Sequence, residues 1–353
     1  MTTVPVEWDR ERIVAERPPR TVALDPLTPH GFFLEEELAA AGRVVSSGTI
    51  LLTNKECPWH CLMCDLWKNT LTQTVPPGAI PRQIEFALAQ FGSLPEQLKL
   101  YNSGSFFDPA AIPVADYADI AKNISFAKHV IVESHPRLIG EKTFRLRDLV
   151  SGSLEVAMGL ETIHPQVLPR LNKKFDLDHF ASTAELLRSE GIAVRAFVLV
   201  KPPFLDDADA IKWAVKSAAF AFDCGAGVVS LIPTRGGNGA MEQLSEAGDF
   251  ALPRLTTLER TQEQALECAR PRAQQRESIH CVQCDHTVRD SDITAPEDGR
   301  APAAMRRVFA DTWDLEPFSE CPACLGMRRQ RLHAMNLSQA ILPAIHCQVC
   351  DVA

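Results

Sequence analysis

Apolar runs rich in β-branched residues alternate with helical patterns from Ser46 onward in this chain. Such alternation is typical of βαβ units, which build a parallel sheet. We expect helices over ranges such as 80–91, 178–189 and 207–222, and six strands at 49–53, 98–101, 129–133, 154–158, 194–200 and 227–232. Six strand–helix repeats predict an α/β fold, a (β/α)6 partial TIM barrel, with all strand carboxyl ends at one rim. Active sites of β/α barrels lie at that rim.

The 353 residues are enough for one large domain and a smaller one. Residues 1–44 are expected to form a lead-in, with a Pro-rich stretch and a short acidic helix near residues 35–41. Residues 45–269 are expected to form the partial barrel. Residues 270–353, where the alternation ends, are expected to form a cysteine-rich metal-binding domain.

The composition limits which cellular compartment and which binding partners we expect for this chain. The net charge of −9 argues against wholesale wrapping by nucleic acid, which requires many basic residues. The first thirty residues contain no apolar run, so we expect no signal peptide, and no segment reaches the 18 or so apolar residues of a membrane span. Eleven cysteines in a chain of this kind favour a cytoplasmic metalloprotein over a disulfide scaffold.

Three cysteines, Cys57, Cys61 and Cys64, fall within eight residues directly after the first predicted strand. A [4Fe–4S] cluster normally takes four thiolates, so three of them leave one iron open to a small molecule. The alternative is a zinc knuckle, which is usually built from C-x2-C pairs. The 3-then-2 spacing of this triad favours the iron–sulfur cluster.

This C-x3-C-x2-C pattern resembles the signature of the radical S-adenosylmethionine (radical SAM) superfamily. The resemblance implies that S-adenosylmethionine binds the open iron through its amine and carboxylate, and that an electron from the cluster generates a 5′-deoxyadenosyl radical, which abstracts hydrogen from the substrate. Cys57, Cys61 and Cys64 would then be catalytic, and a flavodoxin or ferredoxin would supply the electron. Met63 stands where the superfamily usually has an aromatic residue, and its polarizable side chain can fill the same space beside the adenine.

Further candidate cofactor-binding residues follow other predicted strands. The resemblance implies that a small-residue turn after the second strand meets the cofactor's amino group, and a glycine there permits close backbone approach. That turn comprises Tyr101, Asn102, Ser103, Gly104 and Ser105. Glu161 resembles the glutamate of a G-x-E-[ST] turn that binds the cofactor's ribose or ammonium, with a helix-capping or solvated glutamate as the alternative. Arg195, if buried, needs an anionic partner, which is either the cofactor carboxylate or a structural ion pair.

A narrower resemblance rests on residues 54–67, 159–162, 171–174, 197–204 and 232–239. These strings resemble the radical SAM subunit of archaeosine synthase and its bacterial relatives. The resemblance implies a lyase that cleaves a lysine carbon–nitrogen bond on a deazaguanine base in tRNA, after a nucleoside-modifying partner subunit has attached the lysine. Bacterial relatives need not make archaeosine, so a sulfur-inserting or methylthiotransferase-type enzyme with an auxiliary cluster, and a zinc-stabilised RNA-binding adaptor, stay open as alternatives.

Three C-x2-C pairs lie near the carboxyl terminus: Cys281/Cys284, Cys321/Cys324 and Cys347/Cys350. Two pairs make a closed tetrahedral Zn2+ site, which we assign to the last two pairs. The first pair then completes a second site or lies near the substrate, and an auxiliary iron–sulfur cluster is the alternative to zinc. Basic residues between the pairs, from Arg328 to His333, form either a phosphate-contacting or a solvated face of a helix.

Overall fold

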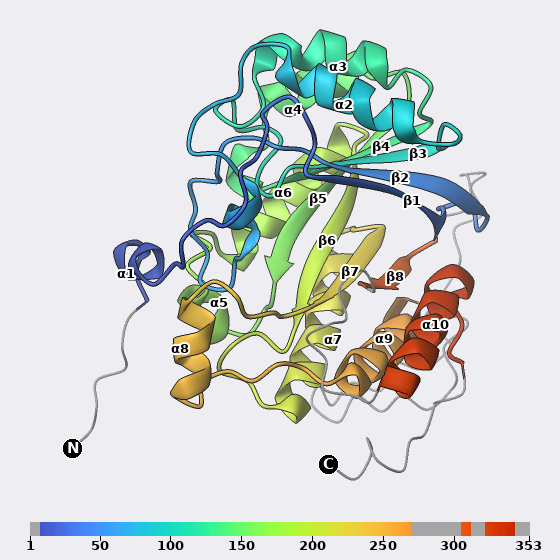
Figure 1. Ribbon diagram of the computed structural model, residues 1–353. Helices are drawn as coiled ribbons and strands as arrows, with labels where there is room; N and C mark the ends of the chain where they lie inside the picture. Colours follow the sequence, from blue (N-terminus) through green and yellow to red (C-terminus); the bar gives the residue numbers. More distant parts are fainter. Residues whose placement is uncertain (1–7, 270–304, 312–321, 343–353) are drawn as a thin grey trace.

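The computed structural model describes residues 8–269, 305–311 and 322–342. Within these residues the strands form an eight-stranded sheet in the order β1-β2-β3-β4-β5-β6-β7-β8, which curls into a half-barrel (Figure 1). Strand β1 (Gly31–Leu38) is antiparallel to β2, and the other neighbouring strands are parallel to each other. The parallel strands are β2 (Val44–Leu51), β3 (Gln97–Tyr101), β4 (His129–Ser134), β5 (Ser153–Glu161), β6 (Ala193–Val200), β7 (Val228–Pro233) and β8 (Arg307–Ala310). The six predicted strands are confirmed as β2 to β7.

Most of the helices lie on the convex outer side of this sheet (Figure 1). The described α-helices are α1 (Arg10–Ala15), α2 (Ala79–Gln90), α3 (Tyr117–Asn123), α4 (Glu141–Leu149), α5 (Val167–Arg170), α6 (Leu177–Ser189), α7 (Asp207–Asp223), α8 (Ala240–Glu246), α9 (Leu255–Ala269) and α10 (Pro322–Ser338). Short 3-10 helices are η1 (Leu66–Asn69), η2 (Val114–Asp116) and η3 (Pro136–Leu138). The predicted helices at 80–91, 178–189 and 207–222 are confirmed as α2, α6 and α7. Aspartates cap α6 and α7, as N-cap preferences predict.

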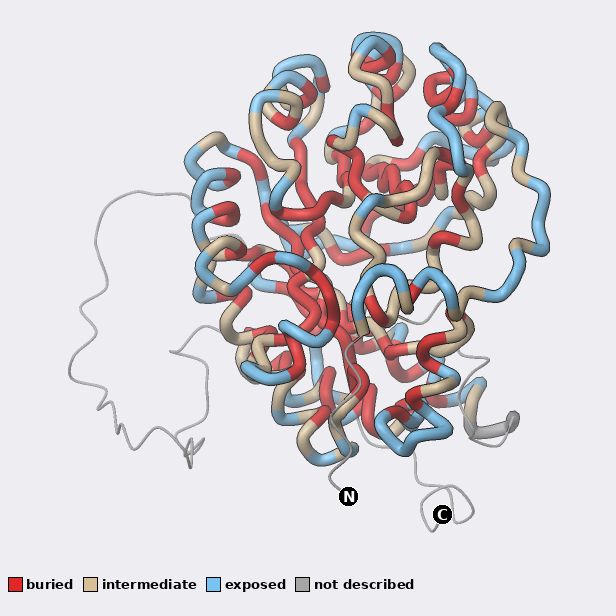
Figure 2. The backbone as a smooth tube through the Cα atoms, turned by 90° about the vertical axis from the view of Figure 1, so that its left-hand side faces the viewer, coloured by how far each residue is buried: buried red, intermediate tan, exposed pale blue. Residues whose placement is uncertain are grey.

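The main hydrophobic core lies between the sheet and the outer helices. Residues at alternate positions of the strands, such as Val130 and Val132 of β4, pack there and are fully buried. Figure 2 shows this buried material running through the middle of the molecule, with exposed segments around it. A smaller apolar cluster on the concave side includes Tyr101, Ile131 and Ala157. No helix in the described part of the chain is long and apolar enough to cross a membrane.

The acidic helix expected near residues 35–41 is wrong, because this segment forms β1. Glu35 and Glu37 alternate with outward-facing residues and both make ion pairs with Lys99 of β3 inside the half-barrel. The buried lysine therefore accounts for acidic residues at alternate positions of a strand. β1 lies within the predicted lead-in, and β8 and α10 lie within the region assigned to the cysteine-rich domain, whose boundaries stay a prediction.

The predicted carboxyl-terminal metal ligands cannot be placed in this architecture. Cys281, Cys284, Cys321, Cys347 and Cys350 lie outside the described residues. Cys324 belongs to α10, and its side chain lies outside the described part as well. The zinc site and its iron–sulfur alternative stay predictions.

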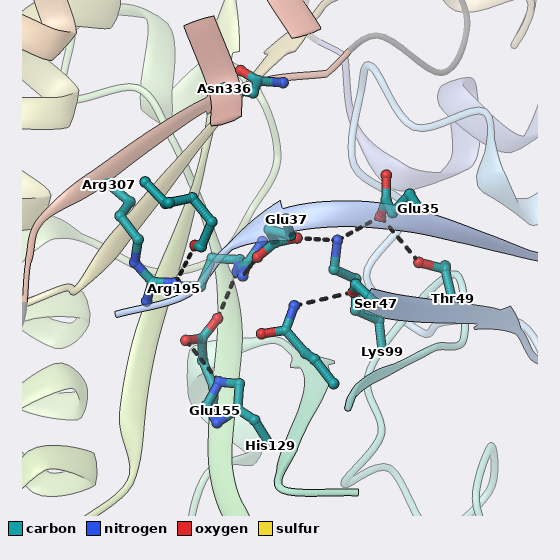
Figure 3. A network of polar contacts seen from close by, with 12 residues as sticks. Glu35, Glu37, Ser47, Thr49, Lys99, His129, Glu155, Arg195, Arg307 and Asn336 are labelled. Carbon is teal, nitrogen blue, oxygen red and sulfur yellow. Dashed lines mark hydrogen bonds and ion pairs between the residues drawn. The ribbon is translucent and has the colours of Figure 1, made fainter. Parts of the chain in front are cut away.

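Arg195 lies in a buried polar network near the amino-terminal end of β6 (Figure 3). Arg195 is 2% exposed, and its guanidinium donates to Glu155 at 2.6 Å and to Glu37 at 2.7 Å. Arg307 of β8 donates to the backbone carbonyl of Leu38 in β1 at 2.9 Å. The network ties both edge strands to the middle of the sheet. The expected pairing of Arg195 with the cofactor carboxylate is therefore corrected to a structural ion pair, because both of its partners are glutamates of the fold.

Candidate functional site

The predicted cluster ligands lie at the carboxyl rim of the sheet, in the loop that follows β2. Cys57, Cys61 and Cys64 are partly buried free thiols. Burial raises the pKa of Cys57 to about 12 and also raises the pKa values of Cys61 and Cys64, because a thiolate is poorly solvated there. The nearby Lys173 ammonium acts in the opposite direction on Cys57 and Cys61. These thiols are protonated at neutral pH and must lose protons to bind a metal.

Hydrogen bonds from distant segments hold this cysteine loop, which we define as residues 54–67. The Leu62 N–H donates to the Leu171 carbonyl at 3.0 Å. The Asn172 amide donates to the His60 carbonyl at 3.0 Å, and the Asn238 amide donates to the Leu62 carbonyl at 2.6 Å. The loop is therefore fixed by the segments that follow β5 and β7, in addition to its own sequence.

Met63 packs against apolar side chains from the segments that follow β6 and β7. It contacts one small cluster that contains Met241 and Phe250, and a second that contains Phe204 and Leu205. Its position in the cysteine loop is thus anchored from the α8 side of the rim. Its expected contact with adenine stays a prediction.

The predicted turn after β3 lies directly against the cysteine loop. A Cβ atom on Gly104 would lie 3.2 Å from the Cβ of Cys57, which is a tight contact, so the glycine lets the turn lie close against the cysteine loop. Asn102 is fully buried, and within the described residues both polar atoms of its side-chain amide lack a hydrogen-bond partner. Its backbone N–H and that of Gly104 donate to Glu133 at 2.6 and 3.3 Å. Since buried polar groups are nearly always hydrogen-bonded, the Asn102 amide indicates a polar ligand or water beside the thiols.

The remaining residues of this turn have different surroundings. Tyr101 points into the half-barrel, where its ring meets Phe197 edge-on at 6.0 Å. Ser103 has a φ of 54°, in the left-handed region. The Ser105 hydroxyl accepts the backbone N–H of His135 at 2.9 Å. The turn is thereby connected to the interior below it and to the segment after β4.

Glu161, at the end of β5, forms a buried ion pair with Lys173. Its Oε1 lies 2.7 Å from the Lys173 Nζ, and both side chains are 9% exposed. Burial alone would lower the pKa of Lys173, but Glu161 and the cysteines outweigh it and raise that pKa. A Cβ on Gly159 would lie 2.6 Å from the Lys173 Nζ and closer still to Glu161, so this glycine makes room for the pair. The helix-capping and solvated alternatives for Glu161 are wrong.

We expect Gly159→Ala to lower the free energy of unfolding by about 1–3 kcal/mol, because the added methyl group displaces the buried ends of Glu161 and Lys173, and these flexible side chains can shift in part. Urea unfolding measures this change. Gly92→Ala is the matched control, since a Cβ there has no neighbour within 4 Å, and it should shift stability by less than about 0.5 kcal/mol. Equal stability of the two variants would contradict the steric role of Gly159.

Four residues at the rim were missed by sequence reasoning: Glu133, His135, Lys173 and Asn238. Glu133 and His135 flank the end of β4, so their place after a predicted strand was the available signal. Lys173 and Asn238 lie within strings that carried the resemblance. The structure brings Lys173 and Glu133 to the cysteines and the turn. Arg195 pairs with Glu37 and Glu155 instead, and it interacts electrostatically with Tyr101 at the start of the turn.

The fold and this site together define an α/β half-barrel with a three-cysteine loop at its carboxyl rim, beside an orphan amide and a buried ion pair. The half-barrel and the cysteine loop at its rim are what the radical SAM resemblance implied, while the orphan amide and the ion pair are additions from the structure. No family model matches the chain.

In sequence the chain is 24% identical to an uncharacterised protein of Methanocaldococcus jannaschii, over 59% of this chain and 61% of that protein. It is 26% identical to the archaeosine synthase subunit beta of Methanosarcina acetivorans, over 48% of this chain and 52% of that subunit. The subunit beta of Thermococcus kodakarensis is 28% identical over 35% of this chain and 40% of its own length. The matches thus cover less than two thirds of each relative. They confirm the expected resemblance to the radical SAM subunit of archaeosine synthase.

Among solved structures, methylornithine synthase aligns with a TM-score of 0.44 and 11% identity, over 60% of this chain and 61% of that one.

Proposed function

We propose that this protein is a radical SAM enzyme. When bound, a [4Fe–4S] cluster supplies the electron that cleaves S-adenosylmethionine and so starts hydrogen abstraction from the substrate. The observation that carries the proposal is the convergence of three free thiols at one rim with the Lys173–Glu161 pair and with the Asn102 amide, which has no partner among the described residues. Sequence similarity to two archaeosine synthase beta subunits supports it.

The residues around the triad fit a cluster with a bound cofactor. Among the residues that the structure describes, no group of three His, Cys, Asp or Glu side chains is close enough to hold one metal ion. The thiolates of a four-iron cluster bind separate irons, so they lie farther apart than the ligands of a single ion. Whether the site suits a cluster with a bound cofactor is therefore tested on the polar groups around the cysteines. Within the part of the chain that the structure describes, Asn102 offers a buried donor and a buried acceptor without partners, as a polar ligand requires.

Each residue of this site has a proposed task. Cys57, Cys61 and Cys64 would hold three irons as thiolates. The Lys173 ammonium would offset the negative charge of cluster and thiolates, since a buried cation stabilises nearby anions. Glu161 would hold that ammonium in place and accept a hydrogen bond from the cofactor's ribose or amine.

The turn that begins at Tyr101 would line the cofactor, with Asn102 binding one of its polar groups and Gly104 allowing close approach. Ser103, Ser105 and Met63 complete the proposed cofactor-binding set. The protein's contribution is orientation and exclusion of water, while the cofactor carries the chemistry.

The finer proposal concerns the substrate. We propose that the enzyme cleaves a lysine carbon–nitrogen bond on a deazaguanine base in tRNA, with a partner subunit that attaches the lysine and a flavodoxin or ferredoxin as reductant. The support is the name shared by the two relatives in Methanosarcina acetivorans and Thermococcus kodakarensis.

Anaerobic reconstitution tests the general proposal. With iron, sulfide, dithionite and S-adenosylmethionine, the protein should release 5′-deoxyadenosine and methionine. Zinc at the triad, or a cluster whose spectrum ignores added S-adenosylmethionine, would overturn it. The substrate is tested by offering tRNA that carries the lysine adduct, and separately the free adduct, with the formamidine product measured by mass spectrometry. Cofactor cleavage without consumption of either adduct would reject the substrate and keep the enzyme class.

A further inference from the structure

One histidine, His135, connects separate segments of the candidate site. It follows β4 directly and is 5% exposed. Its backbone N–H donates to the Ser105 hydroxyl at 2.9 Å, in the turn after β3. Its ring stacks on the Trp59 indole of the cysteine loop, with centroids 4.1 Å apart and an interplanar angle of 16°. The same ring meets Phe175 edge-on at 5.5 Å, so it packs between the cysteine loop and the segment after α5.

Both ring nitrogens of His135 have partners. The Nδ1 accepts the backbone N–H of Arg137 at 3.2 Å, so the ring proton belongs on Nε2. The Nε2 donates to the Lys173 carbonyl oxygen at 2.8 Å. Burial and the neighbouring Lys173 ammonium lower the pKa of His135 to about 3, which keeps the ring neutral at physiological pH.

Lys173, whose carbonyl oxygen accepts the hydrogen bond from His135, carries a positive charge near the thiols. The Lys173 ammonium lies 2.7 Å from Glu161 and interacts electrostatically with Cys61 and Cys57. A lysine side chain has a flexible stem, so the position of its ammonium depends on the backbone to which it is attached. The hydrogen bond from His135 fixes that backbone at the carbonyl of Lys173 itself.

We propose that His135 is a positioning residue whose imidazole docks the Lys173 backbone against Trp59 of the cysteine loop, and so keeps the Lys173 ammonium between Glu161 and the cysteines. Its consequence for the cluster rests on the proposed function. A positive charge held near the cluster favours the reduced, more negative state, so loss of this positioning should lower the reduction potential.

The first test needs no cluster. The Lys173 amine is nearly buried, so a short pulse of acetic anhydride followed by mass spectrometry reports how often it opens to solvent. His135→Phe keeps a ring to stack on Trp59 and loses both ring hydrogen bonds. We expect Lys173 to acetylate about tenfold faster in this variant, because only one of the two lost hydrogen bonds, that from Nε2, holds the Lys173 backbone. His135→Gln can replace the Nε2 donor, and it should restore protection to within about threefold of the wild type.

The second test uses the reconstituted protein. The cluster of His135→Phe should be reduced with an equilibrium constant about tenfold less favourable, which corresponds to about 59 mV for one electron. His135→Gln should recover most of this shift. His129→Phe is the control, because His129 begins the same strand at the opposite end and contacts Ser153 and Glu155 instead. It should change neither the acetylation of Lys173 nor the potential.

The two tests separate the two proposals. Equal acetylation of Lys173 in the wild type and in folded His135→Phe would overturn the positioning role, whatever the cluster does. Failure of the wild type to assemble a cluster would overturn the proposed function and leave the acetylation result standing. A variant that only loses thermal stability, with normal acetylation and normal potential, would make His135 merely structural.

Discussion

Replacing Cys57, Cys61 or Cys64 singly by serine is expected to abolish the iron–sulfur signal that responds to S-adenosylmethionine. Two thiolates cannot hold three irons of the cluster, and a serine hydroxyl is far harder to deprotonate than a thiol. Iron bound at the triad should fall from about four atoms per chain to fewer than about one. Anaerobic reconstitution followed by electron paramagnetic resonance, with and without the cofactor, measures the loss.

Cys224→Ser is the matched control for these variants. Cys224 is a free thiol that caps the carboxyl end of α7, on the outer side of the sheet. Its replacement should leave the cofactor-responsive signal unchanged. A triad variant that keeps the full signal, or a Cys224 variant that loses it, would show that the cluster is not bound where we propose.

The six central strands could be predicted from the sequence because apolar residues, many of them β-branched, dominate them, as in buried parallel strands. β1 could not, since its glutamates are explained by partners far along the chain, such as Lys99, which is 64 residues from Glu35, and Arg195, which pairs with Glu37. β8 is four residues long and belongs to a region where the alternation had ended. Local sequence patterns thus predicted the central strands, which are buried on both faces. They did not predict the edge strands β1 and β8, whose structure depends on partners far along the chain.

The residues of the candidate site likewise fall into two groups, those that sequence motifs predict and those that only the folded chain brings together. The cysteines, the turn after β3 and Glu161 are motifs that directly follow predicted strands, and the fold brings such positions to one rim. His135 and Lys173 are 38 residues apart and find each other only in the folded chain. Their roles therefore needed the structure.

The basic run before His333 corrects a sequence interpretation. Arg328 and Arg331 are buried and pair with Glu259 of α9, at 3.2 and 3.3 Å. These two arginines bind α10 to α9. They belong to neither a phosphate-contacting nor a solvated face, while Arg329 is exposed.

Arg195→Met is expected to lower the free energy of unfolding by about 3–5 kcal/mol, because it leaves Glu37 and Glu155 buried without the guanidinium that joins them. Urea unfolding at neutral pH measures the loss. Arg82→Met, at an exposed position of α2, is the matched control and should change stability by less than about 0.5 kcal/mol. Adding Glu155→Gln to Arg195→Met should recover part of the loss, since it removes one of the uncompensated charges.

The stability of the wild type should depend on pH through the same ion pairs of Arg195. Burial alone would raise the pKa of Glu37, but Arg195 and Lys99 outweigh it and lower that pKa from 4.5 to about 2. Arg195 and His129 also outweigh burial at Glu155 and hold its pKa well below the usual range. A carboxylate whose pKa is depressed in the folded state adds stability above its unfolded pKa and loses it as the pH falls through the folded value. The wild type should therefore lose stability between about pH 4.5 and pH 2. In Arg195→Met this slope should flatten, because the remaining carboxylates protonate at higher pH. If Arg195→Met kept the stability of the wild type but bound S-adenosylmethionine more weakly, the structural role would be wrong and Arg195 would be a cofactor-binding residue.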